Sequence, residues 1–128
     1  MSLFTRAFNK VGGYDRLATS FPGGPEPPGL RWERQCVQFG RGVRYDWCVT
    51  IVVTQTGVWL QARPPAQGVQ AAIFLPWRAF SAARPVRLYW RSAVQLTCGA
   101  PAVGEITVFQ PVWDAAAPYW SAAREYGG

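Results

Sequence analysis

A chain of 128 residues is long enough for one domain with a single core, and its hydrophobic fraction of 49% excludes wholesale disorder. It contains no histidine, and its seven carboxylates are scattered, so the residue types of most enzyme and metal sites are missing. The net charge of +6 comes from twelve arginines and one lysine against seven acids, and it favours an anionic partner. We therefore expect a non-enzymatic domain without a metal or other cofactor.

Residues 1–29 are predicted to form a lead-in to the domain. Residues 1–10 contain no apolar stretch of signal-peptide length, and no segment approaches the roughly 20 apolar residues of a membrane span, so we expect a cytoplasmic protein. Residues 14–21 favour two turns of helix with one apolar face. A proline ends this helix, and the Pro- and Gly-rich residues 22–29 are predicted to be a linker. The barrel domain is then expected over residues 30–128.

Alternating apolar residues predict seven short strands after the linker. In chain order they span residues 30–39, 43–54, 58–63, 70–75, 86–91, 94–98 and 105–109. The second strand is the clearest, and its alternation places Trp47 on the face toward the core. By the same reasoning Trp90 packs inward from the fifth strand, and Ser92 and Ala93 form the turn into the sixth. Residues 78–83 are expected to form a bend or one helical turn.

An alanine-rich stretch predicts a helix over residues 112–126, with Trp113 and Trp120 on its apolar stripe. Pro118 is expected to kink this helix or delay its start. Seven twisted antiparallel strands tend to bend into a sandwich or an incomplete barrel, and the helix then closes one end. Trp59 falls opposite its apolar neighbours in the third strand, so we expect it outside the barrel, under the N-terminal segment.

The three cysteines, Cys36, Cys48 and Cys98, are widely spaced and lie in apolar or strand-like runs. No CxxC pair is present, and no histidine is available to complete a zinc site. We therefore expect reduced thiols that pack as small hydrophobic side chains.

Three stretches of the chain are distinctive, namely residues 45–50 (YDWCVT), 57–60 (GVWL) and 73–80 (IFLPWRAF). Through them the chain resembles a group of uncharacterised bacterial proteins with a pleckstrin-homology-like (PH-like) barrel, related to GRAM and bacterial PH domains. In that group a Gly-x-x-Leu strand is followed by Ile-Pro-Trp-x-x-Ile, where this chain has Leu for the first Ile and Phe for the last. The resemblance covers roughly residues 30–125. It implies a mainly β fold, a seven-stranded antiparallel partly open barrel capped by a C-terminal helix, used to bind lipid headgroups, peptides or proteins.

Two groups of arginines are candidate ligand-binding residues. The first surrounds the turn between the first two strands and comprises Arg31, Arg34, Arg41 and Arg44, of which the last three are the candidates. In the barrel that the resemblance implies, this turn lies at the open mouth, where phosphoinositide-binding members collect cations. Turn amides and arginine guanidinium groups both suit a phosphate. The alternative, which the short turn favours, is that these arginines are solvated charges at a strand edge.

The second group straddles the fifth predicted strand and comprises Arg78, Arg84, Arg87 and Arg91. Its candidates are Arg87 and Arg91, which project from one face of the strand with Tyr89 between them. Basic residues interleaved with aromatic ones can bind single-stranded nucleic acid, but this pattern is more often the solvated face of a half-buried strand. Catalysis has the least support, because no nucleotide-binding motif is present and no motif brings two carboxylates together.

Three functions are compatible with these features. The preferred hypothesis is a non-enzymatic binding or interaction module for an unknown protein or other ligand in a bacterial cytoplasm. The first alternative is binding of an anionic ligand through the surface arginines, either a lipid headgroup at a membrane surface or, less favoured, a nucleic acid. The second alternative is a structural subunit that self-associates along an open sheet edge. The oligomeric state does not follow from the sequence.

Overall fold

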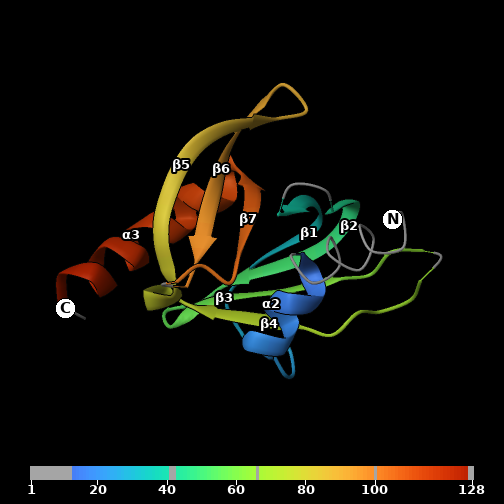
Figure 1. Ribbon diagram of the computed structural model, residues 1–128, viewed down its shortest axis with the longest axis horizontal. Helices are drawn as coiled ribbons and strands as arrows, with labels where there is room; N and C mark the ends of the chain where they lie inside the picture. The colour runs from blue at the N-terminus through green and yellow to red at the C-terminus, as the bar shows by residue number, and fades with distance from the viewer. Residues whose placement is uncertain (1–12, 41–42, 66, 100, 127–128) are drawn as a thin grey trace.

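The computed structural model describes residues 13–40, 43–65, 67–99 and 101–126, and it contains seven antiparallel strands curled into a half-barrel with two helices (Figure 1). The strands are β1 (Leu30–Phe39), β2 (Val43–Val53), β3 (Gly57–Ala62), β4 (Ile73–Pro76), β5 (Phe80–Leu88), β6 (Arg91–Cys98) and β7 (Gly104–Phe109). The helical elements are α2 (Tyr14–Ser20), the 3₁₀ turn η1 (Trp77–Ala79) and α3 (Gln110–Tyr126). The predicted fold class is therefore confirmed, and the architecture is consistent with the PH-like barrel that the resemblance implied.

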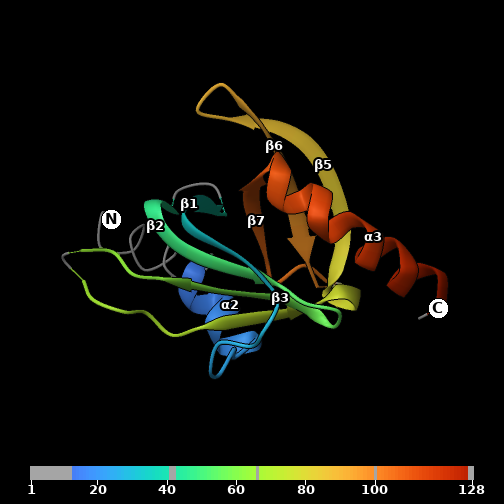
Figure 2. The same cartoon turned by 180° about the vertical axis from the view of Figure 1, so that it is seen from behind.

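All seven strands belong to one sheet, in the order β4-β3-β2-β1-β7-β6-β5. Strand β1 lies at the centre and pairs with both β2 and β7, so it joins the two halves of the sheet. The end strands β4 and β5 follow each other in the chain through η1. Seen from behind, α3 lies across the β5–β7 half (Figure 2). This curvature leaves one continuous interior to be filled with apolar side chains.

The main core fills this interior and draws on every strand. Successive side chains of a strand point to opposite faces, so alternate residues such as Val49 and Ile51 of β2 reach it. Helix α3 contributes Val112 to this core, and its Trp113 and Trp120 pack against the rim. The Trp120 indole also donates a hydrogen bond of 3.0 Å to the carbonyl of Phe80. The predicted packing of these two tryptophans, which holds the helix on the barrel, is confirmed.

The segment before β1 packs against the sheet at two places. Tyr14 and Leu17 of α2 are buried in the main core. Further on, the amide of Gly23 donates to the carbonyl of Ala72 (2.9 Å), and the amide of Phe74 donates to the carbonyl of Phe21 (3.0 Å). Residues 21–23 therefore lie along the start of β4 and cover part of its free edge.

Trp59 confirms the expectation that it lies outside the barrel and beneath the N-terminal segment. Its neighbours Val58 and Leu60 point into the main core, so Trp59 occupies the outer face of β3. It is nevertheless only 2% exposed, and its indole donates a hydrogen bond of 3.1 Å to the carbonyl of Gly24 in the linker. An outer-face tryptophan thus holds the linker against the sheet.

The structure corrects several expected boundaries. Helix α3 begins at Gln110 and continues through Pro118, so the expected delay of its start is wrong. Pro118 is exposed, so its ring meets solvent, while side chains before and after it anchor the helix to the core. Residues 80–83, expected to bend, begin β5 because they pair with β6. Residues 70–72, expected in a strand, precede β4.

Candidate functional site

A cluster of aromatic and arginine side chains lies where the β5–β6 hairpin meets β2 and the end of β7. We call it the hairpin surface, and it comprises Arg44, Trp47, Arg87, Tyr89, Trp90, Arg91 and Phe109. Two of these residues are large hydrophobic side chains left open to solvent, since Trp90 is 88% exposed and Trp47 is 53% exposed. Apolar side chains that are exposed side by side, rather than singly, are typical of interaction sites.

The hairpin turn consists of Tyr89 and Trp90, because Leu88 pairs with Arg91 on either side of them. Both turn residues have positive φ, 53° and 59°. Two-residue hairpin turns of this type favour Asn-Gly, because bulky side chains are strained there. The prediction that Ser92 and Ala93 form the turn is wrong, as is the inward packing of Trp90. The sequence has no turn signal at this point, and the β5–β6 register sets the turn instead.

Trp47 is exposed because β2 bulges beside it. The register between β1 and β2 jumps from Gln35–Val49 to Val37–Tyr45, so the intervening segment of β2 is longer than its partner in β1. Trp47 lies in this bulge with φ 58°, and its amide contacts the sulfur of Cys36 at 3.3 Å. Tyr45 and Val49, on either side of the bulge, both contact the main core, but the extra residues between them turn Trp47 out to solvent. The prediction that Trp47 faces the core is therefore wrong.

A second, smaller hydrophobic cluster supports the hairpin surface from below. Its buried members are Cys36, Leu88, Ala93 and Phe109. Phe109 directly follows Val108 of the main core, so this cluster lies on the opposite face of the sheet. Tyr89 is half-buried against it and stacks on Trp47, with ring centroids 6.2 Å apart. Tyr89, and through it Trp47, therefore packs on this buried cluster.

Arginines cover the aromatic rings of this surface. The Arg44 guanidinium lies 4.6 Å from the ring centre of Tyr89, and that of Arg91 lies 3.9 Å from the ring centre of Phe109. Arg44 also pairs with Asp46 at 3.1 Å. The Asp46 carboxylate raises the pKa of Tyr89, because it favours the neutral phenol, which can donate to it, over the phenolate. Cations and rings thus hold one another in place.

Backbone strain is concentrated in the hairpin surface. Four described residues other than glycine have positive φ, namely Arg34, Trp47, Tyr89 and Trp90. Three of the four are aromatic and belong to this surface. A left-handed conformation costs a non-glycine residue about 1–2 kcal/mol. The three aromatic residues of this surface therefore each carry a cost in stability.

The structure brings together three of the arginines that the sequence singled out. Arg44 comes from the first group, while Arg87 and Arg91 come from the second, and Trp47 contacts the rings that Arg44 and Arg91 cover. Arg87 donates a hydrogen bond of 3.0 Å to the carbonyl of the turn residue Trp90. Arg34 lies instead at a separate bulge of β1, and Arg41 lies outside the described residues.

The aromatic half of this surface does not follow from the sequence. Strand alternation predicts Trp47 and Trp90 in the core and gives Phe109 no role in a site. Tyr89, between two arginines, was the one signal that pointed to the correct hairpin.

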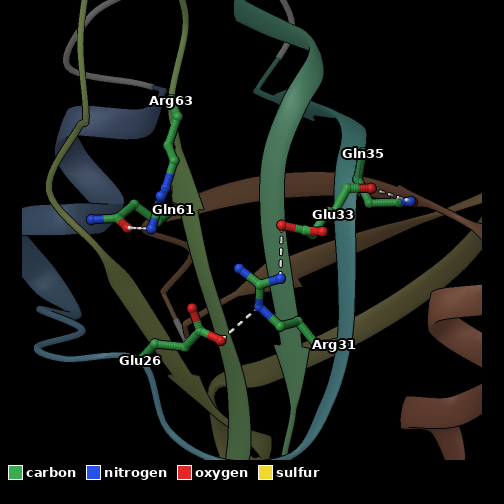
Figure 3. A network of polar contacts seen from close by, with 6 residues as sticks. All are labelled: Glu26, Arg31, Glu33, Gln35, Gln61 and Arg63. Atoms are coloured by element: carbon green, nitrogen blue, oxygen red, sulfur yellow. Dashed lines mark hydrogen bonds and ion pairs between the residues drawn. The ribbon is translucent and has the colours of Figure 1, made fainter.

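On the outer face of β1 and β3, close to Arg34 in the chain, the charge of Arg31 is neutralised by a network of polar contacts (Figure 3). Arg31 lies 2.7 Å from Glu26 and 2.8 Å from Glu33, and its guanidinium lowers the pKa of Glu33. Because two carboxylates surround one arginine, this face offers little attraction to an anion. On the same face, Arg63 donates a hydrogen bond of 3.1 Å to the side chain of Gln61 (Figure 3).

Two neighbouring open grooves, of about 620 and 520 Å³, lie between the β2–β3 turn and α3. Both are lined by Gln55, Thr56 and Phe74; one continues to Tyr119 of α3 and the other to Arg78 of η1. Their walls are mainly apolar, and Arg78 is the single charge among the described lining residues. They lack the convergent polar groups of a specific ligand site.

The described residues carry few groups suited to catalysis. Burial raises the pKa of Cys98 to about 12, and it also raises the pKa of Cys36 and of Cys48. These thiols are protonated at neutral pH and are therefore poor nucleophiles. Within the described part of the chain, no three His, Cys, Asp or Glu side chains gather in a way that could hold a metal ion.

No family model, curated protein or solved structure matches this chain. In the segments that the structure describes, no helix combines the length and apolar character needed to cross a membrane.

Proposed function

We propose that this chain is a non-enzymatic, PH-like binding module of the GRAM-related bacterial type, acting in the cytoplasm through the hairpin surface. One observation carries the proposal: three bulky aromatic residues hold left-handed conformations in one exposed cluster. A turn that served only the fold would use Asn-Gly and avoid this strain. Strain retained at a solvent-exposed position supports a role in binding.

The titration behaviour of the described residues supports a non-enzymatic role. A general acid or base works best with a pKa near neutral pH. Burial instead moves two pKa values away from neutral pH, since it raises the pKa of the Tyr14 phenol and of the Cys98 thiol to about 12 each. Glu33 is shifted below its ordinary range by Arg31.

The charge of the hairpin surface favours an anionic ligand as the second candidate function. Arg44, Arg87 and Arg91 contribute three cations, and Asp46 contributes the one carboxylate paired with them. Binding of an anion at such a surface weakens as ionic strength rises, because exposed charges are screened. The ionic-strength dependence of binding therefore tests this function.

Self-association along a sheet edge has less support. The start of β4 is covered by residues 21–23, as described above. The other edge strand, β5, carries Pro85 in its middle and the exposed Arg84 and Arg87. Proline and charge on an edge strand both oppose pairing with a second chain. Light scattering at micromolar concentration is expected to give the mass of a monomer.

The proposal is tested by replacing the strained residue that contributes least to packing. Trp90→Asn keeps a residue that tolerates the left-handed conformation and removes an indole that is 88% exposed. We expect the free energy of unfolding to stay the same or rise by up to about 1 kcal/mol. Ser92→Asn, on the neighbouring strand position of the same hairpin, is the matched control and is expected to change it little.

Urea unfolding followed by circular dichroism measures both variants. A loss of more than about 1 kcal/mol in Trp90→Asn, beyond that of Ser92→Asn, would show that the tryptophan serves the fold. The argument for a binding role of the turn would then fail.

A further inference from the structure

We infer that the hairpin surface docks on an anionic phospholipid bilayer by inserting Trp90 into its interfacial zone. The inference rests on the proposed function and names the class of ligand. It describes shallow contact by a protruding tip and requires no pocket for a particular headgroup. Four features of the described residues support it.

The first feature is the position of the turn. In both views the β5–β6 hairpin extends beyond the rest of the barrel, with its turn at the outermost point (Figures 1 and 2). Trp90 lies at this turn and is 88% exposed. A flat surface that approaches from this side meets Trp90 first.

The second feature is the side chain itself. Tryptophan combines a large apolar ring with one polar N–H group, and it is enriched at the boundary between headgroups and hydrocarbon. The Trp90 backbone carbonyl is already bonded to Arg87, so the turn enters that boundary with this acceptor satisfied.

The third feature separates a bilayer from a nucleic acid. Single-stranded nucleic acid needs successive free aromatic faces on which bases stack. Arg44 covers the ring of Tyr89, Arg91 covers that of Phe109, and Trp47 stacks on Tyr89. Trp90 is therefore the one ring of this surface that is open on both sides, which suits insertion better than a stacking platform.

The fourth feature is the placement of the cations. Arg91 adjoins Trp90 in the chain, and the Arg87 guanidinium lies 3.0 Å from the Trp90 carbonyl. The headgroup layer of one leaflet is about 5–8 Å deep. With Trp90 at the inner boundary of this layer, Arg87 and Arg91 are close enough to the turn to reach it, and each basic residue near the surface strengthens binding to anionic lipid.

The test is cosedimentation of the full chain with vesicles of phosphatidylcholine alone, of phosphatidylcholine with phosphatidylserine, and of phosphatidylcholine with phosphatidylglycerol. We expect binding to both anionic mixtures to be similar, because charge density rather than headgroup identity attracts the tip. Binding to phosphatidylcholine alone is expected to be much weaker, and high salt is expected to release the protein from the anionic vesicles.

Three variants locate the contact. Trp90→Asn is expected to weaken the partition onto anionic vesicles about tenfold, because the buried indole is lost. Arg87→Gln is expected to weaken it about fivefold. Arg78→Gln makes the same change of charge at η1, beyond the other end of β5, and is expected to leave the partition unchanged. Circular dichroism confirms that each variant is folded.

Several results would overturn the inference. They are absence of binding to both anionic mixtures, equal binding to phosphatidylcholine alone, an unchanged partition of Trp90→Asn, and an equal effect of Arg78→Gln and Arg87→Gln. Binding of a single-stranded oligonucleotide that depends on Trp90, without vesicle binding, assigns the surface to nucleic acid instead. If the protein does not bind anionic vesicles while Trp90→Asn keeps the full free energy of unfolding, the bilayer is not the ligand, and the proposed binding module still stands.

Discussion

The buried hydroxyl group of Tyr14 is expected to make the stability of this protein fall at alkaline pH. Tyr14 is 3% exposed, and its hydroxyl donates to the carbonyl of Ala71 and accepts from the amide of Ala62 at 3.2 Å. Its ring packs edge to face on Phe39 and Tyr45, with centroids 4.9 and 5.4 Å away. Burial raises the pKa of Tyr14 from 10.0 to about 12.

The sign of the effect follows from which state ionises first. Below pH 10 the phenol is neutral in both the folded and the unfolded chain, so its contribution to stability is complete. Between pH 10 and about 12 the unfolded chain loses the proton first, and the free energy of unfolding falls. Two pKa units correspond to about 2.7 kcal/mol, most of which is lost by pH 12.

Tyr14→Phe isolates this contribution. At pH 8 the variant is expected to lose about 1–3 kcal/mol, because the amide of Ala62 and the carbonyl of Ala71 lose a partner. Between pH 8 and pH 11 the wild-type protein is expected to lose about 1.4 kcal/mol more than the variant. Urea unfolding at both pH values measures the difference. Equal losses in the two proteins would refute the reasoning, because the folded state would then not favour the neutral phenol.

Three further predictions concern packing, the helix and thiol reactivity. Trp59→Phe removes the hydrogen bond to Gly24, so it is expected to lower the free energy of unfolding by about 1–2 kcal/mol and to speed protease cleavage within residues 22–29. Unchanged cleavage would mean that this bond does not hold the linker. Pro118→Ala restores a backbone donor inside α3 and is expected to stabilise the protein by about 1–3 kcal/mol in thermal unfolding. A loss of stability in this variant would contradict this account of the helix. Cys98 is buried with a raised pKa, so a thiol reagent is expected to label it only after denaturant is added, and rapid labelling in buffer would contradict its burial.

Much of the fold could be predicted from local patterns. Strand β1 has the bounds Leu30–Phe39 that its sequence predicted, and the apolar stripe with Trp113 and Trp120 identified the packed face of α3. Trp59 was also placed correctly, because the strand around it keeps an unbroken alternation. Where period two or period 3.6 runs without interruption, each residue's face follows from its neighbours alone.

The candidate site could be predicted only in part. Arg44, Arg87 and Arg91 stood out as cations, but they belonged to two groups more than forty residues apart in the chain. They meet because β1 pairs with both β2 and β7, which places the β5–β6 hairpin beside the bulge of β2. Strand order of this kind depends on long-range pairing and leaves no local trace in the sequence.

The sequence by itself determined the class of the fold, the strand-rich middle and the amphipathic end, because these follow from repeating local patterns. Only the tertiary structure decided that Trp47 and Trp90 face solvent. A bulge turns a side chain away from its expected face at a point set by pairing with the partner strand, and a hairpin turn falls wherever the two strands come into register. Both depend on contacts between distant segments, so the alternation of apolar residues could not reveal them.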